Sequence, residues 1–575
     1  MDENALGMML GMLAIALTWV AALAAFCGLG LSLLRWMGLE RDGSEGLFAA
    51  VWIGWALALG ALQVWHLFRP VDAWGRALVV IIGWVGLAWN LRSLWAQLRP
   101  VLRHVLPFAA AAILLGLWMA NRAMAPAMFS DAGLYHLGTV RWLSAYPIVP
   151  GLGNLHWRLA ANSSYFLYMA AMDFGPWSHR AQHVAAYLLL ITLGLQIGWS
   201  AYAVLLRRRA VLAHDLFRLV LLPAVAGKMW GGVHEGEPDL AVWVLGVVII
   251  DKLIGLTGDA PRGRRAWSDV LMVVIASSAA VTVKLSAGVL GIAASGIAMA
   301  WATRSVGTPM SGRLSSASFK ALTLPGFLVA IWVLRGLVLS GYPAFPSTVG
   351  GLAVDWRVPS DIARSEARWI MSWARLPGQN PDVVLQDWAW LQPWAERVAD
   401  VASFDLLAPL GIAAVCLIVA GIRRRRWDAE ALVLAAISMA LAGSLAFWFA
   451  TAPEPRLAGA TAWLLAASSL LLAAGRWGVQ RTRQLARCLF LVVLVAAVAP
   501  HLTSAKRIPP GPETGFYALA QPGLVEVSLP TGLTVFRPAA GDECWDTSLL
   551  CTPYPSTALR LRVAGELGSG FSLPP

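Results

Sequence analysis

The sequence predicts an all-α polytopic membrane protein with about fourteen transmembrane helices, outer-face loops and a small β-rich tail at the C-terminus. Two observations carry this prediction. Hydrophobic residues make up 58% of the 575-residue chain, and charged residues only 13%. Soluble globular proteins carry about 25% charged residues, and a soluble domain could not bury this much apolar surface. The same composition excludes a disordered chain.

A helix needs about 20 apolar residues to cross the hydrocarbon core of a bilayer. Candidate segments fall at 5–34, 46–67, 77–96, 105–122, 181–205, 211–228, 239–256, 268–283, 285–303, 321–340, 404–421, 430–450, 457–474 and 485–502. The segment 211–228 is interrupted by His214, Asp215 and Arg218.

Arginine residues are concentrated in alternate loops between these segments, which the positive-inside rule places in the cytoplasm. Such clusters include 207–209 and 423–426. Both termini are therefore expected on the extracytoplasmic side. The basic residues form no stripe with interleaved aromatic residues, so the net charge of +12 indicates membrane topology and not nucleic-acid binding.

Three predicted outer segments are too long for simple turns. The expected organisation is three N-terminal transmembrane helices in 1–104, a seven-helix unit in 105–340 with an outer loop at 123–180, a large outer loop at 341–402, four transmembrane helices in 403–502 and a tail at 503–575. The cytoplasmic loops are short and contain no nucleotide-binding fingerprint. Any chemistry is therefore expected on the outer face.

The tail alternates apolar and polar residues as β-strands do, around 525–529, 533–535 and 559–563. Cys544 and Cys551 lie in this tail. An oxidising compartment would join them in a disulfide, and the alternative is two free thiols. Cys27, Cys416 and Cys488 lie in apolar segments and are expected to be small apolar fillers.

Asp131, in the segment FSDAGLYHLGTVRW, is the first candidate for a catalytic group. Ser130 is a candidate N-cap, which places Asp131 in the first turn of a helix that runs to about Tyr146. One interpretation is a carboxylate that only interacts with the helix dipole. The other is a general base just above the bilayer, with His136 one turn further along.

A second acidic element, HEGEPDLAVW, directly precedes an apolar segment and contains Glu235, Glu237 and Asp239. Carboxylates this close repel one another unless a cation or substrate neutralises them. They could position an acceptor or, with Asp131, hold Mg²⁺ or Mn²⁺. A solvated cluster at a helix N-terminus is the alternative, and the sequence leaves a metal open.

Four basic residues, Lys228, Lys284, Arg335 and Arg456, lie near the outer ends of predicted transmembrane helices. Cations at this depth are suited to a lipid-linked phosphate, because Arg binds it in a bidentate way and Lys acts as a point charge. The alternatives are snorkelling to headgroups and a local pair of Arg456 with Glu454. In the loop 341–402, five Trp residues could stack on sugars or anchor the loop in the interface: Trp369, Trp373, Trp388, Trp390 and Trp394.

This arrangement resembles the GT-C superfamily of integral membrane glycosyltransferases, which includes the protein mannosyltransferases and the bacterial aminoarabinose transferases. The resemblance covers roughly 105–402. An acidic residue and two short helices follow the first helix of a seven-helix unit, a second acidic site precedes its fourth helix, and a large outer loop follows its seventh. The strings FSDAGLYH, LHWRLAANSS, EGEPDL and SGYPAFPS also resemble those of a bacterial family of polytopic membrane proteins. Three helices precede the unit and no second acidic residue accompanies Asp131, which are departures from the superfamily pattern.

The resemblance implies a glycosyltransferase in the bacterial cytoplasmic (inner) membrane. It would transfer a sugar from a polyprenyl-phosphate donor to a glycan, lipid or protein acceptor on the extracytoplasmic face. Asp131 would accept the acceptor's proton, and the acidic element with His136 would position acceptor or metal. The four cations would bind the donor phosphate.

Three alternatives stay open at this point. A glycan polymerase or ligase of the O-antigen type would also use outer loops and a lipid pyrophosphate. A secondary transporter would carry midplane charges and inverted repeats, and the sequence has no convincing internal repeat. A non-catalytic membrane protein would leave the acidic and basic residues scattered after folding.

Overall fold

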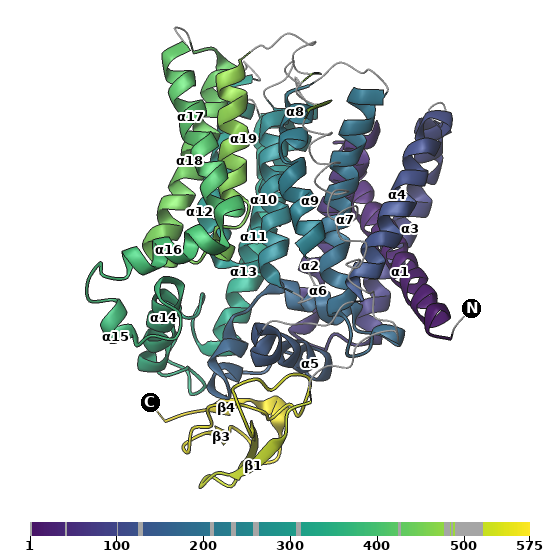
Figure 1. The fold of residues 1–575 in the computed structure, drawn as a ribbon. Coiled ribbons are helices and arrows are strands. Elements are labelled where there is room, and N and C mark those ends of the chain that lie inside the picture. Colours follow the sequence, from purple (N-terminus) through teal and green to yellow (C-terminus); the bar gives the residue numbers. More distant parts are fainter. Residues whose placement is uncertain are drawn as a thin grey trace.

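A computed structural model describes most of the chain as a bundle of long helices with a small sheet at one end (Figure 1). The described residues are 3–40, 43–99, 102–124, 130–206, 212–231, 237–256, 264–305, 312–423, 427–475, 484, 487–488 and 521–574. The long helices are α1 (Glu3–Trp36), α2 (Gly43–His66), α3 (Ala73–Leu98), α4 (Leu102–Ala123), α7 (Gln182–Ala201), α10 (Pro238–Gly255), α11 (Arg264–Val283), α12 (Gly288–Ser305), α13 (Gly312–Ser340), α17 (Ala408–Arg423), α18 (Ala429–Thr451) and α19 (Thr461–Ala474).

The length and composition of these helices indicate a membrane protein. Within the described residues, nine helices are long and apolar enough to cross a membrane, and two shorter apolar helices span Trp267–Val283 and Thr461–Ala474. Nine is fewer than the expected fourteen. The segment expected at 485–502 lies almost entirely outside the described residues.

The segment 211–228 was expected to be one transmembrane helix and is two short ones. Helix α8 (Ala213–Val220) ends at Leu221, and α9 (Leu222–Gly231) follows directly. The break falls just before Pro223, the second residue of α9, because proline has no backbone N–H and its ring clashes with the preceding turn of a helix. Asp215 and Arg218 point into the protein and are 0% and 1% exposed. The Asp215 carboxylate accepts from the backbone N–H of Leu212 at 3.1 Å, so it begins α8 instead of crossing lipid.

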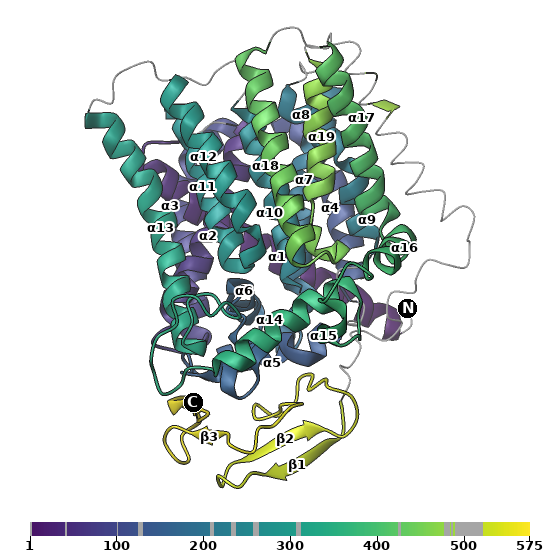
Figure 2. The same cartoon turned by 90° about the vertical axis from the view of Figure 1, so that its left-hand side faces the viewer.

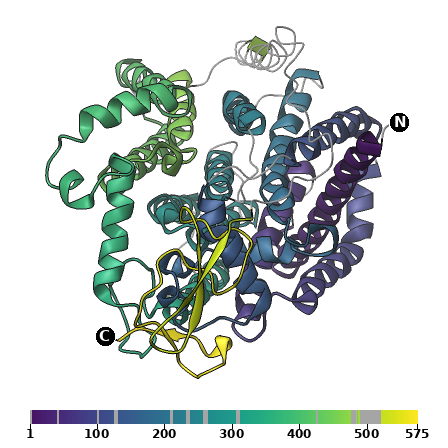
Figure 3. The same ribbon diagram turned by 60° about the horizontal axis from the view of Figure 1, so that its bottom comes forward.

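The C-terminal tail forms two small antiparallel strand pairs, as its alternating pattern predicts. Strand β1 (Leu524–Ser528) pairs with β2 (Thr534–Pro538), and β3 (Arg560–Leu561) pairs with β4 (Phe571–Ser572). The strands lie across one end of the bundle, called here the sheet end (Figures 2 and 3). Trp142, Val535 and Phe571 pack in one buried cluster, so the tail is part of the folded unit.

The segment 130–180 supplies the short helices beneath the tail. A π-helical turn, η2 (Ala132–His136), continues into α5 (Leu137–Ala145), and α6 (Ser164–Met172) follows. The sequence of α6, SYFLYMAAM, is that of a segment suited to lie in the plane of the membrane interface. Instead its side chains are buried on every side, with Phe166 and Tyr168 only 1% and 2% exposed, because α6 packs inside the bundle.

The outer segment 341–402 folds along the same end as three short helices. They are α14 (Ser360–Arg375), α15 (Pro381–Val384) and α16 (Leu391–Val401). Arg375 donates to the carbonyl oxygens of Ala450 at 2.9 Å and Thr451 at 3.1 Å. These bonds fix the end of α14 to the end of α18 (Figure 2).

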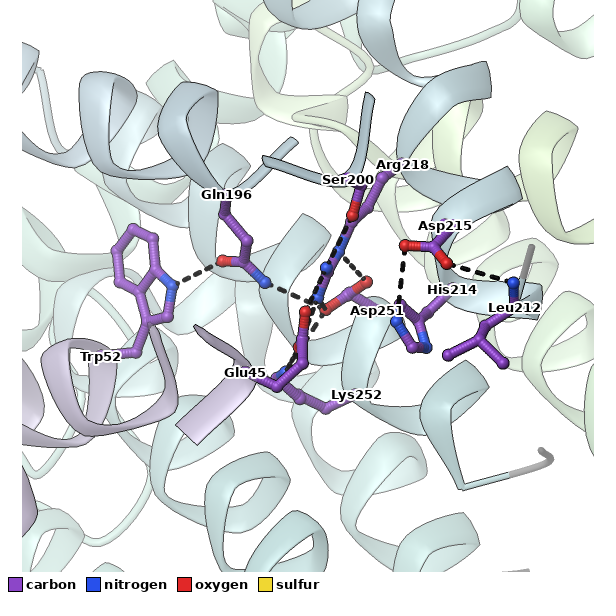
Figure 4. Close-up of polar contacts among 10 residues, drawn as sticks. All are labelled: Glu45, Trp52, Gln196, Ser200, Leu212, His214, Asp215, Arg218, Asp251 and Lys252. Atoms are coloured by element: carbon purple, nitrogen blue, oxygen red, sulfur yellow. Dashed lines mark hydrogen bonds and ion pairs between the residues drawn. The ribbon is translucent and has the colours of Figure 1, made fainter. Parts of the chain in front are cut away.

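An ion network joins helices at the end of the bundle opposite the sheet end, where α8 lies (Figure 1), and its contacts are drawn in Figure 4. Arg218 forms a bidentate pair with Glu45 at 2.5 and 2.8 Å and a second pair with Asp251 through two bonds of 2.7 Å. Lys252 binds Glu45 at 2.8 Å, and Gln196 donates to Asp251 at 3.1 Å. The network therefore connects α2, α7, α8 and α10.

The charges of this network balance, since two carboxylates face two cations. Arg218 makes one further bond, to Ser200 Oγ at 3.0 Å. A buried guanidinium with all these partners is satisfied and has no need of a ligand. We therefore interpret the network as a structural tie that holds α8 in place despite its charges.

Replacing Arg218 should lower the free energy of unfolding of the bundle substantially. The change Arg218→Met leaves Glu45 and Asp251 with too few cations in a buried site, and we expect a loss of about 3–5 kcal/mol in unfolding free energy. The control is Arg69→Met, because Arg69 forms an ion pair with Asp72 while 56% exposed and such pairs contribute about 0.5 kcal/mol. Thermal unfolding in detergent measures both, and equal losses would contradict the assignment.

Candidate active site at the sheet end

Asp131 lies in an ionic cluster formed by segments that are far apart in the sequence. Its Oδ2 accepts a hydrogen bond from Arg456 Nη2 at 2.7 Å, and its Oδ1 lies 3.4 Å from Arg158 Nη1. Asp131 directly precedes η2, and Arg456 lies in the short helix η9 (Pro455–Ala458) between α18 and α19. The carboxylate is therefore held between two guanidinium groups.

Arg456 also connects Asp131 to the acidic element at the start of α10. Its Nη1 lies 3.7 Å from Oε1 of Glu237, and Lys284 forms an ion pair with Asp239. Glu237 is the N-cap residue of α10 and Asp239 lies in its first turn, where the helix dipole favours a carboxylate. Lys284 follows α11 and begins the short helix η7 (Leu285–Ala287).

Two members of the cluster, Arg158 and Glu366, were not identified from the sequence. Arg158 lies in the short helix η4 (Trp157–Ala160), and its Nε is 3.4 Å from Oε1 of Glu366 in α14. Glu366 is 7% exposed, although its helix belongs to a polar segment. Arg158 could have been identified from the sequence, because a lone charged residue among apolar residues predicts a buried partner of opposite charge.

These residues together form what we call the Asp131 cluster. Its members are Asp131, Arg158, Glu237, Asp239, Lys284, Glu366 and Arg456. Four carboxylates and three cations give it a formal charge of −1. The cluster is therefore nearly balanced, with each described carboxylate close to a cation.

The surroundings of two carboxylates shift their pKa values in opposite directions. Burial raises the pKa of Asp131, but the charges of Arg456, His136 and Arg158 outweigh burial and hold this pKa below its usual range. Burial dominates at Glu366, so its pKa is raised despite the nearby Arg158. Asp131 is thus ionised at neutral pH, while Glu366 binds a proton more readily than a free carboxyl does.

His136 lies beside Asp131 within an aromatic group. It is 2% exposed, and its ring centroid lies 4.4 Å from that of Tyr135 and 5.0 Å from that of Phe166. The interaction of its charge with Asp131 is one cause of the lowered pKa of that carboxyl.

A divalent metal does not fit the described part of the site. Among the described residues, no group of three or more His, Cys, Asp or Glu is arranged to hold a metal ion. Glu235, one of the carboxylates expected to hold a metal, lies outside the described residues, as does His234. The other two, Asp131 and Asp239, are each paired with a cation. We derive no step that uses a metal.

Two of the four expected phosphate-binding cations lie outside the Asp131 cluster. Lys228, on α9, pairs with Asp405 at 3.2 Å. Arg335, on α13, is 2% exposed and bonds to His66 of α2 at 2.8 Å. Proximity to a helix end sets the depth of a residue but not the direction in which it points around the helix axis, and these two point elsewhere.

The expected alternative of a local pair between Arg456 and Glu454 is not what the described residues form. Arg456 pairs with Asp131 and Glu237, and Glu454 pairs with Arg397 at 2.7 Å.

The C-terminal tail braces the segment that carries Asp131. The predicted disulfide between Cys544 and Cys551 is present, with Cα atoms 5.9 Å apart. Within the loop that it closes, the backbone N–H of Trp545 donates to the carbonyl of Gly133 at 2.7 Å. A Cβ at Gly133 would lie 2.6 Å from the Trp545 ring, so only glycine allows this contact.

Ion pairs complete the contact between the tail and this segment. Asp546 lies 3.3 Å from Arg141 Nε and 2.6 Å from His179 Nδ1. Arg141 also donates to the carbonyl of Thr547. The tail therefore fixes α5, and with it the turn that places Asp131.

The Trp residues of the 341–402 segment divide into two groups. Trp390 is 4% exposed, and the Arg375 guanidinium lies 4.9 Å from its ring centroid, so it packs inside the fold. Trp394 is partly buried and donates from its Nε1 to the carbonyl oxygen of Pro453 at 2.6 Å, so it belongs with Trp390. Trp369, Trp373 and Trp388 are 42%, 51% and 68% exposed. Only this second group is placed to contact lipid or a ligand.

The fold and the site define a helical membrane protein with a nearly balanced ionic cluster at one end of its bundle. The chain belongs to the family described as Domain of unknown function (DUF8201), which matches residues 12–462. The match includes every member of the Asp131 cluster and ends before the C-terminal strands. No curated protein and no solved structure matches the chain.

The lowered pKa of Asp131 predicts how its contribution to stability depends on pH. A carboxyl with a lowered folded-state pKa stabilises the protein above its unfolded pKa of about 4, and this stabilisation is lost as the pH falls through the folded pKa. Asp131→Asn should therefore cost about 1–3 kcal/mol at pH 7. The difference from wild type should shrink below about pH 4.

Thermal unfolding of both proteins from pH 7 to pH 3 measures this difference. The control is Asp72→Asn, because Asp72 also binds an arginine and caps a helix, but outside the Asp131 cluster. A difference for Asp131→Asn that grows as the pH falls would contradict the pKa direction.

Proposed function

We propose that the chain is a glycosyltransferase that moves a sugar from a polyprenyl-phosphate donor to an acceptor at the sheet end. The Asp131 cluster carries this proposal. Six segments separated by much of the chain bring an ionised carboxylate, further acidic groups and three cations to one end of an apolar bundle. Transfer from a lipid phosphate needs these groups at the boundary between water and lipid.

The expected orientation is consistent with this chemistry. The positive-inside pattern assigns the sheet end to the extracytoplasmic face. A disulfide in the tail fits an oxidising compartment. A donor that arrives attached to lipid needs no nucleotide-binding site in the cytoplasmic loops. We accordingly propose a GT-C-like arrangement in a bacterial inner membrane.

The reaction is a single in-line displacement at the anomeric carbon. The acceptor oxygen forms the new bond to this carbon while the bond to the phosphate oxygen breaks. Asp131 takes the acceptor's proton as general base, and the leaving phosphate keeps the bonding electron pair. Arg456 and Lys284 stabilise the charge that grows on the phosphate. Glu237 and Asp239 position the acceptor.

The ion pairs of the cluster couple donor binding to the activation of Asp131. In the structure Arg456 is bound to Asp131, so it lowers the pKa of the base and makes it weak. A donor phosphate competes with this carboxylate for the same guanidinium. When Arg456 turns to the phosphate, the pKa of Asp131 rises towards the value that a general base needs.

Loss of the Asp131 carboxylate should abolish turnover while the protein stays folded. Purified wild type in nanodiscs is given a panel of polyprenyl-phosphate sugars with candidate acceptors, and the release of polyprenyl phosphate is measured. We expect Asp131→Asn to be about 10²–10⁴-fold slower. Asp72→Asn is the matched control and should keep wild-type turnover. Equal rates for Asp131→Asn and wild type would exclude Asp131 as the base.

A further inference from the structure

Arg335 is a buried cation without a carboxylate partner among the described residues. Its side chain is 2% exposed, its Nη1 contacts His66 Nδ1 at 2.8 Å, and its Nε has no hydrogen-bond partner. A guanidinium carries its positive charge at neutral pH. It is also only a donor, so His66 Nδ1 accepts this bond and the imidazole is neutral. The positive charge of Arg335 is therefore not compensated by His66.

A small cavity lies against this guanidinium. It has a volume of about 20 Å³ and is lined by residues of α2, α5, α13 and the segment 147–163. Its lining contains Arg335, His66, Thr139, Asn162 and Ser163 among mostly apolar side chains, and no Asp or Glu. Since about 10–15 Å³ suffices for one water molecule, the cavity has room for a single small species.

The loop beside the cavity is held in an uncommon conformation. Asn162 has φ 46°, in the left-handed region, and exchanges two bonds of 2.7 Å with Trp332 of α13. These bonds fix the next residue, Ser163, whose buried hydroxyl has no hydrogen-bond partner among the described residues. Arg335, Ser163 and Asn162 all line this cavity, and among the described residues Arg335 Nε, Ser163 Oγ and Asn162 Oδ1 have no hydrogen-bond partner.

We propose that this cavity binds one small monovalent anion of the size of chloride. A buried guanidinium without a counter-charge is strongly destabilising, whereas an anion there neutralises it and accepts from Arg335 and Ser163. A water molecule would supply no charge. None of the cavity's lining residues belongs to the Asp131 cluster, so this site is separate from the proposed catalytic one.

The bound anion would stabilise the junction of α2, α5 and α13. The test measures thermal unfolding of the purified full chain while chloride replaces gluconate at constant ionic strength. We expect a saturable rise of the wild-type midpoint by at least about 2 °C. Arg335→Met should lose this rise and, in gluconate, should be no less stable than wild type, because the uncompensated charge is gone.

Two further variants keep the test decisive if Arg335→Met folds poorly. Ser163→Ala keeps the charge but removes a donor, so the chloride concentration for half the effect should rise about 3–10-fold. Lys228→Met is the matched control, because Lys228 already pairs with Asp405, and its chloride response should equal that of wild type.

Three outcomes would overturn the proposal. Chloride could stabilise Arg335→Met as strongly as wild type, which would place its effect elsewhere. Chloride could have no effect on the unfolding midpoint of wild type. Inorganic phosphate could stabilise wild type where chloride does not, which would require a larger oxyanion site. None of these outcomes depends on transferase activity, so the anion site and the proposed function stand or fall separately.

Discussion

The arrangement of the sheet end depends on the ion pair between Arg456 and Asp131. These residues are 325 positions apart in the sequence, and their 2.7 Å bond joins the segment after α4 to the turn between α18 and α19. Through Arg456 the same contact reaches Glu237 at the start of α10. Charges at a membrane boundary are costly when unpaired, so each segment is held where the others neutralise it.

The two ionic regions of the bundle differ in how completely their charges are paired and how far they are exposed. At the opposite end, Arg218, Glu45, Asp251 and Lys252 are fully paired, and the two cations are 1% and 5% exposed, which suits a structural tie. At the sheet end, Arg456 is 37% exposed at its side chain and divides its bonds between two carboxylates. An ion pair that water and ligands can reach is easier to exchange. This difference favours the Asp131 cluster, rather than the buried network, as the place for chemistry.

The sequence predicted which residues form this site better than it predicted where their side chains point. Four residues of the site could be found because a charged residue beside an apolar segment indicates a partner or a function. They are Asp131, Asp239, Lys284 and Arg456, and the structure brings them together. Hydropathy sets how deep a residue lies, but the rotation of a helix about its axis depends on packing. The contacts of Arg335 with His66 and of Lys228 with Asp405 therefore could not be predicted from the sequence. The positions of Arg158 and Glu366 depend on the path of the loops, and loop sequences have no hydrophobic periodicity from which this path could be predicted. The strands and the disulfide of the tail were predictable because alternation and cysteine chemistry are local signals.

A double-mutant cycle between Asp131 and Arg456 tests the convergence of these segments most directly. Unfolding free energies are measured at pH 7 for wild type, Asp131→Asn, Arg456→Met and the double variant. If the two side chains form the ion pair, the double variant should lose less than the sum of the single losses, with a coupling of about 1 kcal/mol or more. Losses that add within about 0.5 kcal/mol would show that the residues do not interact, and the cluster would then not exist as described.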